Sequence, residues 1–148
     1  MSANNVQFSI ASHILTVLAY RPAGHATSKE LAQSISANPT FIRKTIARLG
    51  KAGLVVSTRG ASGTCTLARP AQTITLLEIY IASEASPVFS VHSYPVNDAC
   101  EVGTDIKSRM KDVLQAAQTS FEVKLAGMTL LDLMPRKKCS EFRLNSAT

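Results

Sequence analysis

The stretch from Pro39 to Lys51 carries basic and small residues whose spacing suits the reading of double-stranded DNA. With a helical period these residues share one face, while the apolar residues between them fall on the opposite face. Arginine and lysine donate hydrogen bonds to phosphate oxygens and guanine edges, and threonine and alanine allow close approach to the major groove. The residues of this basic face are Thr40, Arg43, Lys44, Ala47 and Lys51.

A helix-turn-helix would position this face. Residues 28–35 are predicted to form its first helix, capped by Thr27 or Ser28. Asn38 is the predicted cap of the second helix, and Pro39 fits the first helical position, where no backbone donor is needed. The second helix then presents the basic face to solvent.

A β-hairpin is predicted to follow the second helix as a wing. Gly53 ends the helix, and the β-prone runs 54–59 and 64–68 flank a glycine-containing turn. Arg59 lies at the tip, where an arginine can enter the minor groove. The predicted DNA-contacting set is Ser28, Pro39, Thr40, Arg43, Lys44, Ala47, Lys51 and Arg59.

The charge is distributed unevenly along the 148 residues. Residues 1–70 hold eight Lys/Arg and one acid, Glu30, whereas residues 71–148 hold eight Lys/Arg and nine Asp/Glu, for a net charge of +6. A basic first half and a nearly neutral second half fit a nucleic-acid-binding unit joined to a unit with another role. No apolar run is long enough to span a membrane, and the three distant cysteines are not a disulfide framework, so we expect a cytoplasmic protein without a membrane partner.

Apolar residues in the second half recur at the spacing of one long helix that begins near Thr104. The amino-terminal domain is too small to cover this stripe, so the same helix of a second copy is its predicted cover. Packing within one chain is the alternative. A symmetric homodimer would suit a palindromic operator. The predicted interface residues are Ile106, Met110, Val113, Leu114, Ala117 and Phe121.

The predicted fold is mainly α with a small β-wing: a winged helix-turn-helix domain plus a long dimerisation helix. Residues 1–83 are the DNA-binding domain, in which an apolar helix over 8–19 supports the other two helices. Residues 84–103 are predicted to form a connecting or sensory loop, 104–134 the dimerisation helix and a short following helix, and 135–148 a flexible tail.

Five segments of the chain resemble the bacterial winged-helix transcription regulators typified by the iron–sulfur-cluster-assembly repressor and the nitrite- and nitric-oxide-sensing repressor. The resemblance implies a homodimer joined through the long helix, which represses or activates genes through a palindromic operator, with a sensory loop before that helix. Of the two, we expect a repressor. The segments are 28–32, 49–55, 59–63, 67–70 and 74–79.

The predicted sensory loop departs from the cluster-binding members of that family. They offer three closely spaced cysteines in the loop, whereas this chain offers only Cys100, as in a single-cysteine branch. We therefore predict no cofactor and no metal site. The alternative is an iron–sulfur-sensing regulator in which Cys100 is joined by the weaker ligands His92, Asp98 and Glu101 or by cysteines of both subunits.

A thiol at Cys100 would lie just before the long helix, where exposed amides and the helix dipole favour an anion. Oxidation to a sulfenic acid or a disulfide could then couple oxidative or electrophile stress to DNA affinity. Cys139 is a candidate resolving partner and equally a bystander. The alternative is a Cys100 that only fills space.

Other classes of protein find little support. The chain has no glycine-rich phosphate loop, metal-ligand pair or nucleophile elbow, so no catalytic residue and no enzyme are predicted. A winged helix used as a protein-interaction module would call for an apolar or acidic face. Arg43, Lys44 and Lys51 argue against that alternative.

Overall fold

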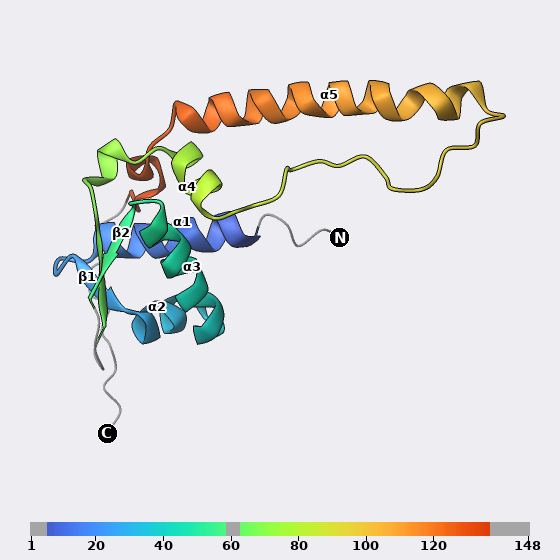
Figure 1. Cartoon of the computed structure of the whole chain (residues 1–148). Helices are drawn as coiled ribbons and strands as arrows, with labels where there is room; N and C mark the ends of the chain where they lie inside the picture. Colours follow the sequence, from blue (N-terminus) through green and yellow to red (C-terminus); the bar gives the residue numbers. More distant parts are fainter. Residues whose placement is uncertain (1–5, 59–62, 137–148) are drawn as a thin grey trace.

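Three helices and a small antiparallel sheet make up the first part of the chain. The computed structural model describes residues 6–58 and 63–136. Figure 1 shows these elements gathered into one body from which a single long helix extends. In chain order they are α1 (Val6–Tyr20), β1 (His25–Thr27), α2 (Ser28–Ile35), α3 (Pro39–Lys51), β2 (Val55–Ser57) and β3 (Thr64–Leu67).

The second part continues with short elements and then the long helix. The elements are the 3-10 helix η2 (Ala71–Thr73), α4 (Leu76–Ala82), α5 (Glu101–Ala126) and the 3-10 helix η3 (Leu130–Leu133). The predicted fold class is confirmed, because the described residues are mainly helical with a three-stranded wing sheet.

The sheet contains one strand that the sequence did not predict. Its strand order is β1-β3-β2, with β3 antiparallel to both neighbours; Ala26 pairs with Cys65, and Val56 pairs with Thr66. Because β1 leads directly into α2, the sheet fastens the wing to the helix-turn-helix.

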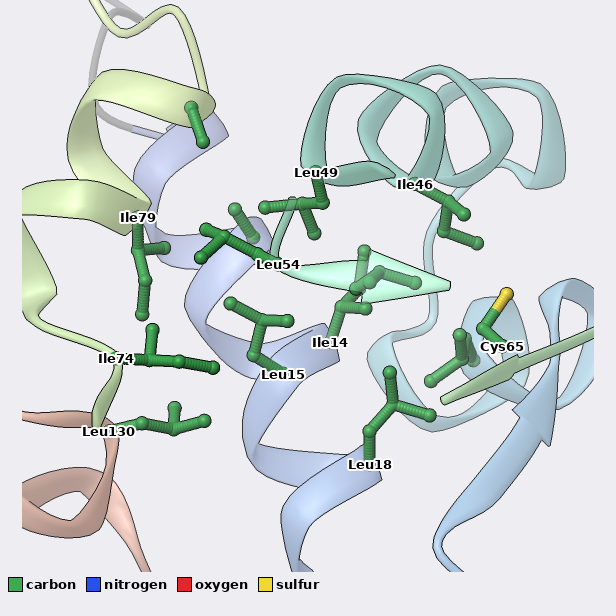
Figure 2. Packing of buried hydrophobic residues seen from close by; sticks show 14 of the residues in the cluster. Ile14, Leu15, Leu18, Ile46, Leu49, Leu54, Cys65, Ile74, Ile79 and Leu130 are labelled. Carbon is green, nitrogen blue, oxygen red and sulfur yellow. The ribbon is translucent and has the colours of Figure 1, made fainter. Parts of the chain in front are cut away.

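Helix α1 lies at the centre of the apolar core. Ile14, Leu15 and Leu18 are fully buried or nearly so. Figure 2 shows them surrounded by side chains from α3, the sheet, α4 and the segment after α5, among them Leu49 and Leu130. Burial of each such side chain stabilises the fold by about 1.5–3 kcal/mol. The predicted role of the first helix as the support for the others is confirmed.

The base of α5 is attached to this body by its last turns and by the residues that follow. Tyr80 of α4 stands edge-on to Phe8 of α1, with ring centroids 5.5 Å apart, and to Phe121 of α5, at 5.3 Å. Leu76 N–H donates to Met128 C=O and Leu130 N–H donates to Ile74 C=O, both at 2.9 Å. The carboxyl-terminal third of α5 is therefore held, and the remainder extends away (Figure 1).

Helix α5 starts at Glu101 rather than after a cap at Thr104. Cys100 is its cap, because the Cys100 Sγ accepts a hydrogen bond from the Gly103 N–H at 3.3 Å. The connecting segment between α4 and α5 consequently ends at Cys100.

A pair of Thr-x-x-Glu capping boxes starts α2 and α4. Thr27 N–H donates to Glu30 at 2.7 Å and Thr75 N–H donates to Glu78 at 2.8 Å, while each threonine hydroxyl accepts the glutamate N–H at 3.2 Å. These backbone hydrogen bonds are the largest cause that lowers the pKa of both carboxyls. Burial opposes them, and the threonine hydroxyls and the guanidinium groups of Arg21 and Arg69 lower the pKa further.

The capping carboxylates predict a specific loss of stability in acid. A carboxyl whose pKa is lower when folded stabilises the fold above its unfolded pKa of about 4.3, and that stability is lost as the pH falls through the folded value. Glu30→Gln is expected to lower Tm by about 2–4 °C at pH 7, if the charged cap contributes about 1 kcal/mol. The difference from wild type should shrink as the pH falls through the folded-state pKa of Glu30 and should vanish once the carboxyl is protonated in both states.

The measurement is thermal unfolding by circular dichroism from pH 7 to pH 3 at one protein concentration. Asp98→Asn removes an exposed carboxyl with no hydrogen bond or ion pair in the described parts of the chain, and serves as the control. A constant difference between wild type and Glu30→Gln over the whole range contradicts the charged-cap explanation.

Candidate nucleic-acid interface

The start of α3 is fixed by local hydrogen bonding, as the sequence predicts. Asn38 Oδ1 accepts the Thr40 N–H at 2.8 Å, and Pro39 occupies the first helical position. Gly53, which follows the helix cap Ala52, adopts φ +75°, a left-handed conformation that glycine allows without strain. Both helix boundaries agree with the predicted ones.

The two faces of α3 separate as predicted. Ile42, Ile46 and Leu49 are buried in the core. The predicted DNA-contacting residues of α3 are all exposed: Pro39 at its start, and Thr40, Arg43, Lys44, Ala47 and Lys51 on the basic face. Ser28 is half-buried at the first position of α2, and Arg59 lies outside the described residues. The structure thus brings the α3 residues onto one surface, and their contact with DNA stays a prediction.

Ion pairs divide the cations of this region into two groups. Arg21, Arg48 and Arg69 pair with Glu30, Glu84 and Glu78 at 3.1, 3.0 and 2.6 Å. Over residues 6–58 and 63–136 no ion pair involves the exposed cations of α2 and α3, which are Lys29, Arg43, Lys44 and Lys51. The uncompensated charge is therefore concentrated on the helix-turn-helix, where it would attract a polyanion.

Two threonines, Thr58 and Thr64, join the two arms of the wing hairpin. Thr58 N–H donates to Thr64 C=O at 2.9 Å, and Thr64 N–H donates to the Thr58 hydroxyl oxygen at 3.0 Å. These bonds hold the two arms of the hairpin together immediately before its tip. The wing is thereby aligned beside the helix-turn-helix through β3.

The described cysteines differ in access. Cys65 lies in β3 and is 3% exposed, and burial raises the pKa of its thiol. Cys100 is exposed at the end of the connecting segment. Cys139 lies outside the described residues. Among the cysteines that the structure describes, only Cys100 is open to a solute.

A model of the Rrf2 family, described as iron-dependent transcriptional regulators, matches residues 4–136. The chain belongs to the Rrf2 family. YwnA of Bacillus subtilis (strain 168) is 33% identical over 132 residues, which cover 88% of this chain and 96% of YwnA. YwnA is described as a candidate HTH-type transcriptional regulator.

Solved structures resemble this Rrf2-family protein along most of its length. The crystal structure of a candidate DNA-binding protein is 28% identical with a TM-score of 0.68, over 87% of this chain and 99% of the other. IscR of T. potens is 26% identical with a TM-score of 0.63, over 90% of this chain and 84% of the other. The relatives that these comparisons name are regulators of transcription and not enzymes.

The family description names iron, and an iron centre needs several His, Cys, Asp or Glu side chains close together. In the described ranges no three His, Cys, Asp or Glu side chains are grouped so that they could hold a metal ion. Cys65 is buried in the sheet, so Cys100 has no described cysteine beside it. Within one chain the described residues therefore do not fit a cluster. In the same ranges no helix is long and apolar enough to cross a membrane.

Two cations of this region were not among the residues predicted from the sequence. Lys29, in the first turn of α2, is an exposed cation beside the predicted contact Ser28, and its position after the cap was a usable signal. Arg48 lies on α3 but is paired with Glu84 from the end of α4. No local pattern predicts that pair, because its members are distant in the sequence.

The exposed cations of α3 predict a salt-dependent loss of DNA affinity on substitution. Arg43→Gln is expected to weaken binding to duplex DNA about tenfold, and to reduce the slope of log K against log salt by about 0.9, because one phosphate contact is lost. Binding would be followed by fluorescence anisotropy between low and moderate KCl. Lys124→Gln makes the same charge change on α5 and should leave the slope unaltered. Equal effects of the two substitutions would show that net charge alone is responsible.

Proposed function

We propose that this Rrf2-family protein is a cytoplasmic, homodimeric transcription regulator that binds a palindromic operator in double-stranded DNA and acts there as a repressor. The observation that carries the proposal is the exposed face of α3, whose cations have no ion pair in the described residues. A major groove accepts a helix with such a face. The cations of the helix reach phosphates, and the small side chains of Thr40 and Ala47 let the helix approach the bases closely.

The exposed stripe of α5 supports the dimer. The helix has 26 residues, hence a length of about 39 Å, and only its last turns are packed on the chain's own body. Val102 is 69% exposed and Val113 is 59% exposed, and Ile106 and Met110 are exposed as well. A second copy of α5 would cover this stripe and would bring two α3 helices to one duplex.

The predicted interface residues differ in how free they are for a partner. Ile106, Met110, Val113 and Ala117 are exposed, and Leu114 is half-buried. Phe121 already packs edge-on against Tyr80 of its own chain. The partner helix is therefore proposed to lie mainly along the part of α5 that precedes Gln118.

A charge in the middle of the stripe is expected to break the dimer. Val113→Asp should weaken self-association at least about a hundredfold, because each subunit would bury a carboxylate against apolar residues. Its operator affinity should fall with it. Sedimentation velocity over a concentration series would measure the association. Ser108→Asp, on the opposite side of α5, is the control and should stay dimeric. A monomeric wild type, or a dimeric Val113→Asp, would contradict this interface.

The connecting segment is proposed to act as a sensory loop through Cys100. The thiol is exposed, and its sulfur accepts the Gly103 N–H at the amino end of α5. With hydrogen peroxide as the oxidant, the sulfur attacks one peroxide oxygen and the O–O bond breaks. The departing hydroxide takes the thiol proton, so that a sulfenic acid and water form. Such a change at the cap of α5 would alter the helix end and, through it, the position of the two DNA-binding domains.

The sensor role of Cys100 has a direct test. Wild-type affinity for a duplex from the gene's own upstream region is expected to change about 5- to 150-fold after stoichiometric hydrogen peroxide, the usual range of coupling between two sites. Cys100→Ser should bind as tightly as reduced wild type and should not respond. Cys65→Ala, which removes the buried thiol, should respond like wild type. An unchanged response in Cys100→Ser would assign the effect to another thiol, and an indifferent wild type would discard the switch while keeping the regulator.

A further inference from the structure

We propose that Arg48 is an additional DNA-phosphate contact of α3, which Glu84 restrains by an ion pair under the control of the connecting segment. This inference rests on the proposed function of α3. It assigns a role to the one α3 arginine that faces a carboxylate rather than solvent.

Arg48 lies at the edge of the exposed α3 face. It follows Lys44 by four residues, which places it about 40° further around the helix axis, next to the outer face. Its Nε lies 3.0 Å from Glu84 Oε2, and its side chain is 31% exposed. No second carboxylate in the described residues pairs with its guanidinium. A rotation of this long side chain would present a fifth cation to the duplex.

Glu84 is held in place by its backbone. It follows the end of α4 and adopts φ +54°, a left-handed conformation that few residues other than glycine adopt. Its N–H donates to Ile81 C=O at 3.1 Å. The carboxylate is 65% exposed, so the backbone, and not burial of the side chain, sets where it lies.

The residues on each side of Glu84 connect its backbone to α5. The Ser83 hydroxyl donates to Tyr80 C=O at 2.7 Å, and the Tyr80 hydroxyl donates to Ser86 C=O at 2.9 Å. Gln118 of α5 donates to the Tyr80 hydroxyl oxygen at 3.1 Å and accepts the Val88 N–H at 3.0 Å. A shift of α5 or of the connecting segment is therefore transmitted to Glu84, and through it to Arg48.

The Arg48–Glu84 ion pair is weak enough to hold the arginine reversibly. An ion pair this exposed contributes little to stability and is screened by salt, so a phosphate can compete for the arginine. While Glu84 is in place, its negative charge cancels most of the attraction of Arg48 for the duplex. Moving or neutralising the carboxylate leaves the cation available.

A double-mutant cycle on the full-length protein tests the restraint. The probe is a mixed-sequence duplex, with affinity measured at several KCl concentrations. Glu84→Gln is expected to bind about three to ten times more tightly at low salt, with a slope steeper by about 0.9, because one more phosphate is neutralised. Arg48→Gln alone should differ from wild type by less than about twofold, and the double variant should match Arg48→Gln.

The outcomes separate this inference from the function on which it rests. Absence of duplex binding in wild type contradicts DNA binding itself. Binding by wild type with no gain in Glu84→Gln, or an equal gain when Arg48 is already replaced, contradicts only the restraint. Asp98→Asn adds the same net charge on the connecting segment, and a gain as large as that of Glu84→Gln would overturn the proposal as a general charge effect.

The transmission to α5 has its own variant. Tyr80→Phe keeps the ring packing but removes the hydroxyl that joins Ser86 to Gln118. It is expected to tighten DNA binding in the same direction as Glu84→Gln, by a smaller factor, and only when Arg48 is present. Thermal unfolding checks that the fold is intact. No change in affinity in a folded Tyr80→Phe would overturn the link between α5 and Glu84.

Discussion

The packing of Tyr80 between Phe8 and Phe121 determines how the long helix leaves the DNA-binding part of the protein. The two edge-to-face contacts join α1, α4 and α5, and the hydroxyl adds hydrogen bonds to Ser86 and Gln118. Aromatic pairs of this geometry contribute about 0.5–1.5 kcal/mol beyond their buried area. Together with the hydrogen bonds that join Val88 to Gln118 and Leu76 to Met128, this side chain sets the direction in which α5 leaves the body.

The arginines of the winged part show how one residue type serves two purposes. Arg21 and Arg69 each bind a glutamate that caps the following helix, so they belong to the architecture of α2 and α4. Arg43 has no such partner in the described residues and remains available to a ligand. The ion pairs with the capping glutamates therefore neutralise Arg21 and Arg69, whereas the charge of Arg43 stays uncompensated on the surface proposed to bind DNA.

The elements that the sequence predicted are those with a local cause. Asn38 and Pro39 start α3, and the spacing of Ile42, Ile46 and Leu49 sets which face of α3 is buried. Strand β1 was missed because three residues, His25–Thr27, carry no alternation and are ordered only by pairing with β3. The start of α5 was placed late because a cysteine sulfur is an unusual cap. The Arg48–Glu84 pair and the Gln118 contacts arise from tertiary packing, which a single sequence does not reveal.

The order of the sheet, β1-β3-β2, has a consequence for how regulation can work. The strand before α2 and the strand after α3 both pair with β3, so neither α2 nor the wing can tilt without breaking ladder hydrogen bonds. The winged domain consequently presents a surface whose backbone shape is constant. In the proposed dimer, two such surfaces would discriminate operators by the separation and relative angle of two identical half-sites. An inducer would change that separation and angle, or the side chains on the surface, without reshaping the winged domain itself.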